Sequence, residues 1–193
     1  IIGPESLVYF SNGLIKNKKA SLLFTFDDGL KNNLIAAKIL KDNGITALFF
    51  VVPNFINASE NKQGKDYYLQ NIRPIVNPKF DKEPEDFESM NWEEIGSLTK
   101  TGHAIGSHSM SHRLALNSSE DELLLEIVKS KEEIERKTNL SVIHFCSPNN
   151  TALSVSEKAE ELIEEHYDYH FTTFHGSNSA LGSKQLIKRI NIE

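Results

Sequence analysis

Short apolar runs alternate along this chain with stretches of helical periodicity. Continuous apolar runs at residues 21–26, 46–52 and 142–146 predict buried strands, and residues 103–107, 169–174 and 186–192 predict three more. Polar segments with helical spacing separate them. Because strands and helices alternate about five times, the pattern predicts an α/β fold with a parallel sheet, either open or closed into a barrel.

The helices are predicted from apolar spacing and from the residues that begin and end them. Residues 32–43 and 156–165 form two of them, and Gly44 stands where a helix C-terminal glycine belongs. Two more begin at capping boxes. The apolar residues expected to pack inward are Leu34, Ile35, Ile39 and Leu40 in the first helix. The capping pairs are Asn91 with Glu94, and Ser119 with Glu122 before a long helix with the stripe Leu123, Ile127, Ser130 and Ile134.

Residues 53–90 interrupt this alternation. The segment is 38 residues long, is rich in Asn, Lys, Asp and Glu, and contains four prolines. Unstructured loops of this length are uncommon in compact domains and are often functional. We therefore interpret residues 1–193 as a single domain with an insertion at about residues 53–90, which has some structure of its own and could serve as a lid.

Composition narrows the chemistry. Of the 193 residues, 39% are hydrophobic and 25% are charged, which is ordinary for a soluble globular protein. No apolar run approaches the roughly 20 residues of a membrane span. The single cysteine, Cys146, excludes a disulfide scaffold and a thiolate zinc finger. Histidine and carboxylate are therefore the side chains left to bind a metal.

The chain carries a net negative charge, and that charge is concentrated in one segment. The net charge of −6 argues against electrostatic binding to nucleic acid, which needs a basic face. Residues 81–94 hold seven acidic residues and one lysine, so this segment accounts for the whole net charge. The charge pattern therefore gives no indication of a partner, and it leaves the oligomeric state open.

Two adjacent carboxylates, Asp27 and Asp28, follow the first predicted strand. Carboxylates at the end of a buried strand are costly unless each has a partner. Successive residues point in different directions, so one can bind a metal while the other acts as a base. The plain alternative is a turn with a helix cap, because Asp-Gly is common in turns.

A pair of histidines, His108 and His112, follows the strand at residues 103–107. Four residues apart, they are close enough to share a metal, although two ordinary histidines would fit the spacing as well. Functional groups gather at the carboxyl ends of parallel strands, so the two clusters should meet. One carboxylate and two histidines make three protein ligands and leave a position open for water, as in catalytic zinc sites.

A third polar cluster, residues 145–150, follows another strand and reads Phe-Cys-Ser-Pro-Asn-Asn. The turn at Pro148 could aim a backbone N–H group at a reaction centre, where it would stabilise an oxyanion. A plain loop is the alternative.

These motifs resemble those of polysaccharide deacetylases, the NodB homology group or carbohydrate esterase family four. Residues 25–29, Thr-Phe-Asp-Asp-Gly, resemble the first motif of that family, and residues 106–112, Gly-Ser-His-Ser-Met-Ser-His, resemble the second. The resemblance extends over about residues 20–192. It implies a distorted (β/α) barrel with fewer than eight strands, and so an α/β fold.

The resemblance also implies roles for the motif residues. Asp27 would be the general base, and Asp28, His108 and His112 would hold a divalent metal, usually Zn²⁺. The substrate would be an acetylated saccharide, bound in part through the backbone N–H of Asn149. The family removes acetyl groups from N-acetylated sugars, and some members act on O-acetyl groups or on cyclic imides.

The later family motifs are altered in this chain. The arginine that usually pairs with the catalytic aspartate is replaced by Cys146, so we expect the pKa of Asp27 to rise. Arg189 could replace that arginine, or it could be a surface charge. His175, at the end of a late strand, is the candidate catalytic acid, or else a loop histidine.

The sequence thus predicts a metal-dependent hydrolase that deacetylates an N-acetylated saccharide. One alternative is a carbohydrate-binding pseudoenzyme that keeps the metal but lacks a working acid. The other is a C–N hydrolase of the same fold that acts on a cyclic imide or ureide in a closed site.

Overall fold

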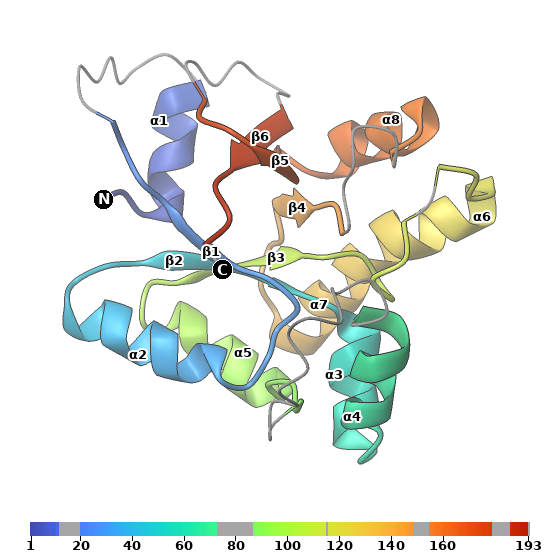
Figure 1. Ribbon diagram of the computed structural model, residues 1–193, viewed down its shortest axis with the longest axis horizontal. Coiled ribbons are helices and arrows are strands. Elements are labelled where there is room, and N and C mark those ends of the chain that lie inside the picture. The colour runs from blue at the N-terminus through green and yellow to red at the C-terminus, as the bar shows by residue number, and fades with distance from the viewer. Residues whose placement is uncertain (12–19, 73–86, 115, 149–154, 179–185, 193) are drawn as a thin grey trace.

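Six parallel strands form the centre of the protein in a computed structural model, which describes residues 1–11, 20–72, 87–114, 116–148, 155–178 and 186–192 (Figure 1). The strands are β1 Phe24–Phe26, β2 Ala47–Val51, β3 Ala104–Ser107, β4 His144–Cys146, β5 Tyr169–His175 and β6 Leu186–Arg189. They are hydrogen-bonded in sequence order, and every pair is parallel. The sheet curls into a half-barrel, so the predicted distorted barrel with fewer than eight strands is confirmed.

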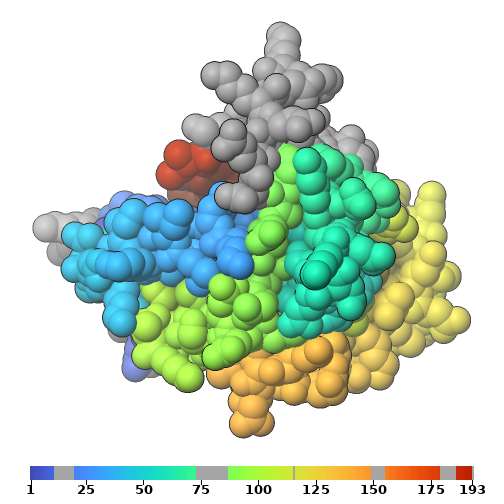
Figure 2. Space-filling view, turned by 90° about the horizontal axis from the view of Figure 1, so that it is seen from below, coloured from blue at the N-terminus to red at the C-terminus, as the bar shows by residue number. Residues whose placement is uncertain are grey.

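Helices surround this sheet, and most of them lie on its outside. They are η1 Pro4–Ser6, α1 Leu7–Ser11, α2 Asn33–Asp42, α3 Pro53–Glu60, α4 Gly64–Tyr67, α5 Trp92–Thr99, α6 Glu120–Leu123, α7 Ser130–Thr138 and α8 Glu157–His166. Two π-helical segments, η2 Tyr68–Ile72 and η5 Leu124–Lys129, extend α4 and join α6 to α7. Figure 2 shows α2, α5 and the α3–α4 pair side by side on one face of the molecule.

Alternate residues of the strands fill two apolar layers. In β2, where every residue is fully buried, Phe49 and Val51 face the helices while Leu48 and Phe50 face the inside of the curled sheet. Inside the sheet they meet side chains from other elements, among them Leu7, Cys146, Phe171 and Ile187. Burying one such side chain contributes about 1.5–3 kcal/mol. The two layers hold the strands rigidly, so the loops at their carboxyl ends are placed with little freedom.

The helix boundaries follow the sequence prediction closely. Asn91 with Glu94 and Ser119 with Glu122 each form both hydrogen bonds of a capping box, and the predicted stripe of the long helix is buried. The prediction of which residues of α2 face the core was wrong in part, because Ile35 and Ile39 are 66% and 58% exposed. Ala37 is buried there instead, with Leu34 and Leu40 packed against the core, since these positions are the ones rotated toward the sheet.

The segment at residues 53–90 begins as regular structure. Residues 53–72 form α3, α4 and η2, and Ile56 of α3 belongs to the main core. Residues 73–86 lie outside the described part of the chain, and with them lie most of the acidic residues in the 81–94 segment. No helix within the described ranges is long and apolar enough to cross a bilayer.

Candidate metal centre

The turn after β1 separates the two adjacent carboxylates. Asp28 and Gly29 both have left-handed backbone conformations, with φ of 69° and 82°, and the Gly29 N–H donates to the Asp27 carbonyl at 2.9 Å. A Cβ on Gly29 would come within 3.2 Å of Val51 Cγ1, so the positive φ and the close packing both favour glycine. The turn directs Asp27 toward Arg189 and Asp28 toward the two histidines.

The loop after β3 carries His108 and His112. It continues from the strand without a break, since the His108 N–H donates to the Val51 carbonyl at 2.9 Å. Ser109 and His112 both have a φ of 63°. With Asp28, they are three of the five non-glycine residues of positive φ in the described ranges. Strained backbone of this kind persists only where the surrounding structure enforces it, and it concentrates at functional sites.

The two loops bring the predicted metal ligands together. Asp28 Oδ1 lies 3.7 Å from His108 Nε2 and 3.5 Å from His112 Nε2. Tetrahedral coordination at about 2.1 Å separates neighbouring ligand atoms by about 3.4 Å, so a single ion fits among these atoms with little adjustment. The imidazoles are 3% and 6% exposed, and the Asp28 side chain is 19% exposed.

Hydrogen bonding and burial prepare these side chains to bind a cation. His108 Nδ1 lies 2.7 Å from the Cys146 carbonyl and must be the donor, which leaves Nε2 as the ring nitrogen that can bind a cation. Burial lowers the pKa of His112 to about 3, with a smaller contribution from the neighbouring His108, so the His112 ring is neutral at pH 7. Burial raises the pKa of Asp28 to about 6, because no cation among the protein groups fully offsets its desolvation. Two imidazole nitrogens and a carboxylate whose charge is poorly compensated by the protein suit a divalent metal.

Asp27 lies beside this group and has a partner from the opposite edge of the sheet. Arg189 Nη1 and Nη2 donate to its two carboxylate oxygens at 2.7 Å each. Arg189 also donates to Thr25 Oγ1 and to the Thr172 carbonyl, and its side chain is 9% exposed. The guanidinium therefore joins β6 to β1 across the open side of the sheet.

This pairing corrects the expected pKa of Asp27. Burial alone would raise it, but His108 and the hydrogen bonds and charge of Arg189 outweigh burial, so the pKa lies below its usual range. The expectation of a raised pKa was wrong because the arginine missing from β4 is replaced by one on β6. Cys146, in its place on β4, is fully buried, and its Sγ lies near Asp27 and His108.

Comparison with known proteins identifies the chain. A family model described as polysaccharide deacetylase matches residues 15–167, about four fifths of the sequence. The chain belongs to the polysaccharide deacetylase family. No curated protein sequence matches it significantly. The matched region ends before β5 and β6, so Arg189 lies outside it.

Solved structures of the family share this fold. The deacetylase PplD of Streptococcus pyogenes, solved with acetate, is 18% identical with a TM-score of 0.72, and the match covers 99% of this chain and 73% of that one. IcaB of Ammonifex degensii is 17% identical with a TM-score of 0.75, over 100% and 76%. A family pseudoenzyme from Bacillus anthracis is 17% identical with a TM-score of 0.54, over 79% and 43%. At these identities the likeness shows the fold alone.

For this family member, we expect Arg189→Met to lower kcat/KM for deacetylation by about 10- to 100-fold at neutral pH. Without the guanidinium, burial raises the pKa of Asp27, so the acidic limb of the pH–rate profile should move to higher pH. The measurement is kcat/KM from pH 4 to 9.

The matched control for Arg189→Met returns an arginine from β4. Cys146→Arg in the Arg189→Met background places a guanidinium within reach of Asp27 and should recover part of the lost rate. An unchanged pH profile in Arg189→Met would show that Arg189 does not govern Asp27.

The two remaining predicted site residues are not part of this cluster. His175 ends β5, its backbone is in register with Arg189, and its side chain is exposed. Its position on β5 places it at the same end of the sheet as Asp27, but its role as an acid stays a prediction. Asn149 lies outside the described residues.

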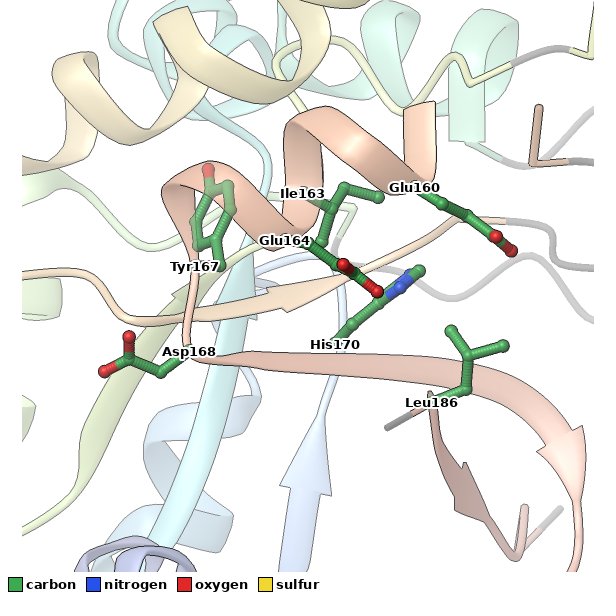
Figure 3. A pocket seen from close by; sticks show the side chains of 7 residues that line it. All are labelled: Glu160, Ile163, Glu164, Tyr167, Asp168, His170 and Leu186. Atoms are coloured by element: carbon green, nitrogen blue, oxygen red, sulfur yellow. The ribbon is translucent and has the colours of Figure 1, made fainter. Parts of the chain in front are cut away.

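A second buried polar pair, Ser147 and His170, lies apart from the metal centre. Ser147 Oγ is 2.6 Å from His170 Nε2, and both residues are buried. Beside His170 is a cavity of about 40 Å³ between α8 and β5, where Glu160 and Glu164 point toward it (Figure 3). This volume holds a few water molecules at most, so the cavity cannot take a sugar.

Proposed function

We propose that this member of the polysaccharide deacetylase family is a metal-dependent hydrolase that removes acetyl groups from an N-acetylated saccharide. The observation that carries the proposal is the convergence of Asp28, His108 and His112 next to an Asp27 carboxylate that is held by Arg189. The family match supports deacetylation, and the donor set supports the metal.

The residues divide the chemistry between them. Asp28, His108 and His112 would hold the divalent ion, which we take to be Zn²⁺, and the bound ion would polarise the acetyl carbonyl and lower the pKa of a water. Asp27 is the proton acceptor. Each of its oxygens keeps a second lone pair while bonded to Arg189, so Asp27 can accept a proton from water without losing its orientation.

The leaving amine requires a proton and the developing oxyanion requires a donor. His175 is the candidate acid, since its strand ends at the same carboxyl end of the sheet as the strand that carries Asp27. The backbone N–H of Asn149 is the candidate oxyanion donor and substrate contact.

The pairing of Asp27 with Arg189 favours an enzyme over the pseudoenzyme alternative. The altered third to fifth motifs are the reason to consider a pseudoenzyme, and for the third of them the salt bridge from β6 supplies the charge that Cys146 lacks. The cyclic imide alternative depends on whether residues 53–90 close the site, and residues 73–86 of that segment lie outside the described chain.

The test of the proposed function is acetate release from a panel of N-acetylated and O-acetylated oligosaccharides, with a cyclic imide as a separate substrate. We expect release from the N-acetylated saccharides, loss after dialysis against a chelator and recovery with added Zn²⁺. Hydrolysis of the imide alone would favour the C–N hydrolase. Saccharide binding without acetate release would favour the pseudoenzyme.

A further inference from the structure

Glu126 is a buried carboxylate on the long helix that follows the metal-binding loop. Its side chain and backbone are 6% exposed, although it lies in the apolar stripe between Leu123 and Ser130. A charged group at such a position is costly unless hydrogen bonds compensate for its lost hydration. The partners of Glu126 should therefore explain its presence in the core.

In the described part of the chain, the groups that donate hydrogen bonds to the Glu126 carboxylate belong to the loop between the two histidines. Ser111 N–H donates to Glu126 Oε2 at 2.9 Å, and Ser111 Oγ donates to Oε1. The Met110 N–H donates to the Glu126 backbone carbonyl at 3.0 Å. One helical residue thus takes three hydrogen bonds from two consecutive loop residues.

The π-helical segment η5 makes these contacts possible. Glu126 lies in the middle of η5, where i→i+5 bonding replaces the i→i+4 pattern of the α-helix. The carbonyl of Glu126 is consequently available to Met110, and that of the next residue, Ile127, accepts from Tyr167 Oη at 2.7 Å. Single π turns of this kind inside α-helices are frequent at functional sites.

The opposite side of the loop is held by the segment that begins the 53–90 region. Tyr67 Oη donates to the Ser111 carbonyl at 3.0 Å, and the Asn54 N–H donates to the Met110 carbonyl at 3.0 Å. The loop is therefore held by hydrogen bonds to η5 on one side and to α3–α4 on the other. On the η5 side, Glu126 is the side chain that bonds to it.

We propose that Glu126 is a positioning residue that fixes the Ser111–His112 turn, so that the imidazoles of His108 and His112 meet at Asp28. The inference rests on the proposed metal site. Ser109 and His112 have strained, left-handed backbone, and such residues relax unless their neighbours are held. Ser111 stands directly before His112, and its N–H and hydroxyl both end on the Glu126 carboxylate.

The first test measures metal affinity. We expect Glu126→Ala to weaken Zn²⁺ binding by about 10- to 100-fold, which is the usual effect of removing a group that orients metal ligands. Glu126→Gln keeps one acceptor oxygen for the Ser111 N–H and can donate to its hydroxyl, so it should recover most of the affinity. The matched control is Glu135→Ala on α7, whose carboxylate accepts from the Val142 N–H at 2.9 Å, away from the loop.

The second test needs no metal. In the metal-free protein, the Ser111 amide should exchange its hydrogen much faster in Glu126→Ala than in the wild type, whereas Glu135→Ala should accelerate the Val142 amide and leave Ser111 protected. If Glu126→Ala does not fold, Glu126→Gln and Ser111→Ala take its place, and Ser111→Ala should weaken zinc binding in the same way.

Two results would overturn the role of Glu126. One is wild-type zinc affinity in Glu126→Ala, and the other is unchanged protection of the Ser111 amide. Failure of the wild-type chain to bind zinc would contradict the proposed function instead, and the exchange measurement would still decide whether Glu126 holds the loop.

Discussion

Asp27→Asn should abolish acetate release while the metal stays bound. An amide in place of the carboxylate cannot accept a proton from water, and the loss of a general base lowers kcat by about 10²- to 10⁴-fold. The metal should remain because its proposed ligands, Asp28, His108 and His112, are unchanged. Acetate release and metal content should be measured on the same preparation.

Asp42→Asn provides a matched control for Asp27→Asn. Asp42 ends α2 on the surface, where it pairs with Lys38, and it has no part in the site. Its replacement should leave acetate release unchanged. If Asp27→Asn kept the wild-type rate, another group would have to be the base. If it lost its metal as well, Asp27 would have to be counted among the ligands.

His108→Ala should remove about one divalent ion per chain and, with it, the activity. His108 contributes one of three proposed ligand atoms, and a site reduced to Asp28 and His112 should bind the ion far more weakly. Elemental analysis of the purified proteins gives the metal content. Zn²⁺ at about 100 times its Kd should stabilise the wild type by about 2.7 kcal/mol and raise its Tm by roughly 5–10 °C. The variant should show no such shift.

The control for His108→Ala is His166→Ala, in the last turn of α8, which should keep both the metal and the thermal shift. His108 is buried and bonded to the Cys146 carbonyl, so its removal also costs stability in the absence of metal. His112→Ala, which leaves that bond intact, should lose the metal to the same extent. Equal metal content in the wild type and both site variants would contradict the proposed centre.

Asp27 and Arg189 show which part of the site could be predicted from the sequence and which could not. The motif around Asp27 is contiguous and could be read directly, whereas Arg189 is 162 residues away along the chain. Only the curl of the sheet brings β6 back to β1. From the sequence, Arg189 was one candidate to replace the arginine lost at Cys146, with a plain surface charge as the alternative, and the predicted rise in the pKa of Asp27 was wrong.

The loop that carries His108 and His112 also combines features that the sequence predicts with features that it does not. The spacing of His108 and His112 predicted a shared ion, because four residues cannot separate two side chains far. The residues that grip the loop, Glu126 and Tyr67, come from two other segments and have no motif of their own. The local sequence signal for a role of Glu126 in holding the loop is the position of a glutamate beside Leu123 and Ile127 in the apolar stripe of the helix.

The sequence by itself determined what depends on near neighbours: the alternation of strands and helices, the capping boxes at Asn91 and Ser119, and the motif residues at two strand ends. These features rest on periodicity, hydrogen bonds within one turn and short spacing. The tertiary structure decided which face of α2 is buried, which arginine meets Asp27 and what holds the loop at Ser111. Each of these depends on how a curled six-stranded sheet packs distant segments together, and that packing is set by the whole core.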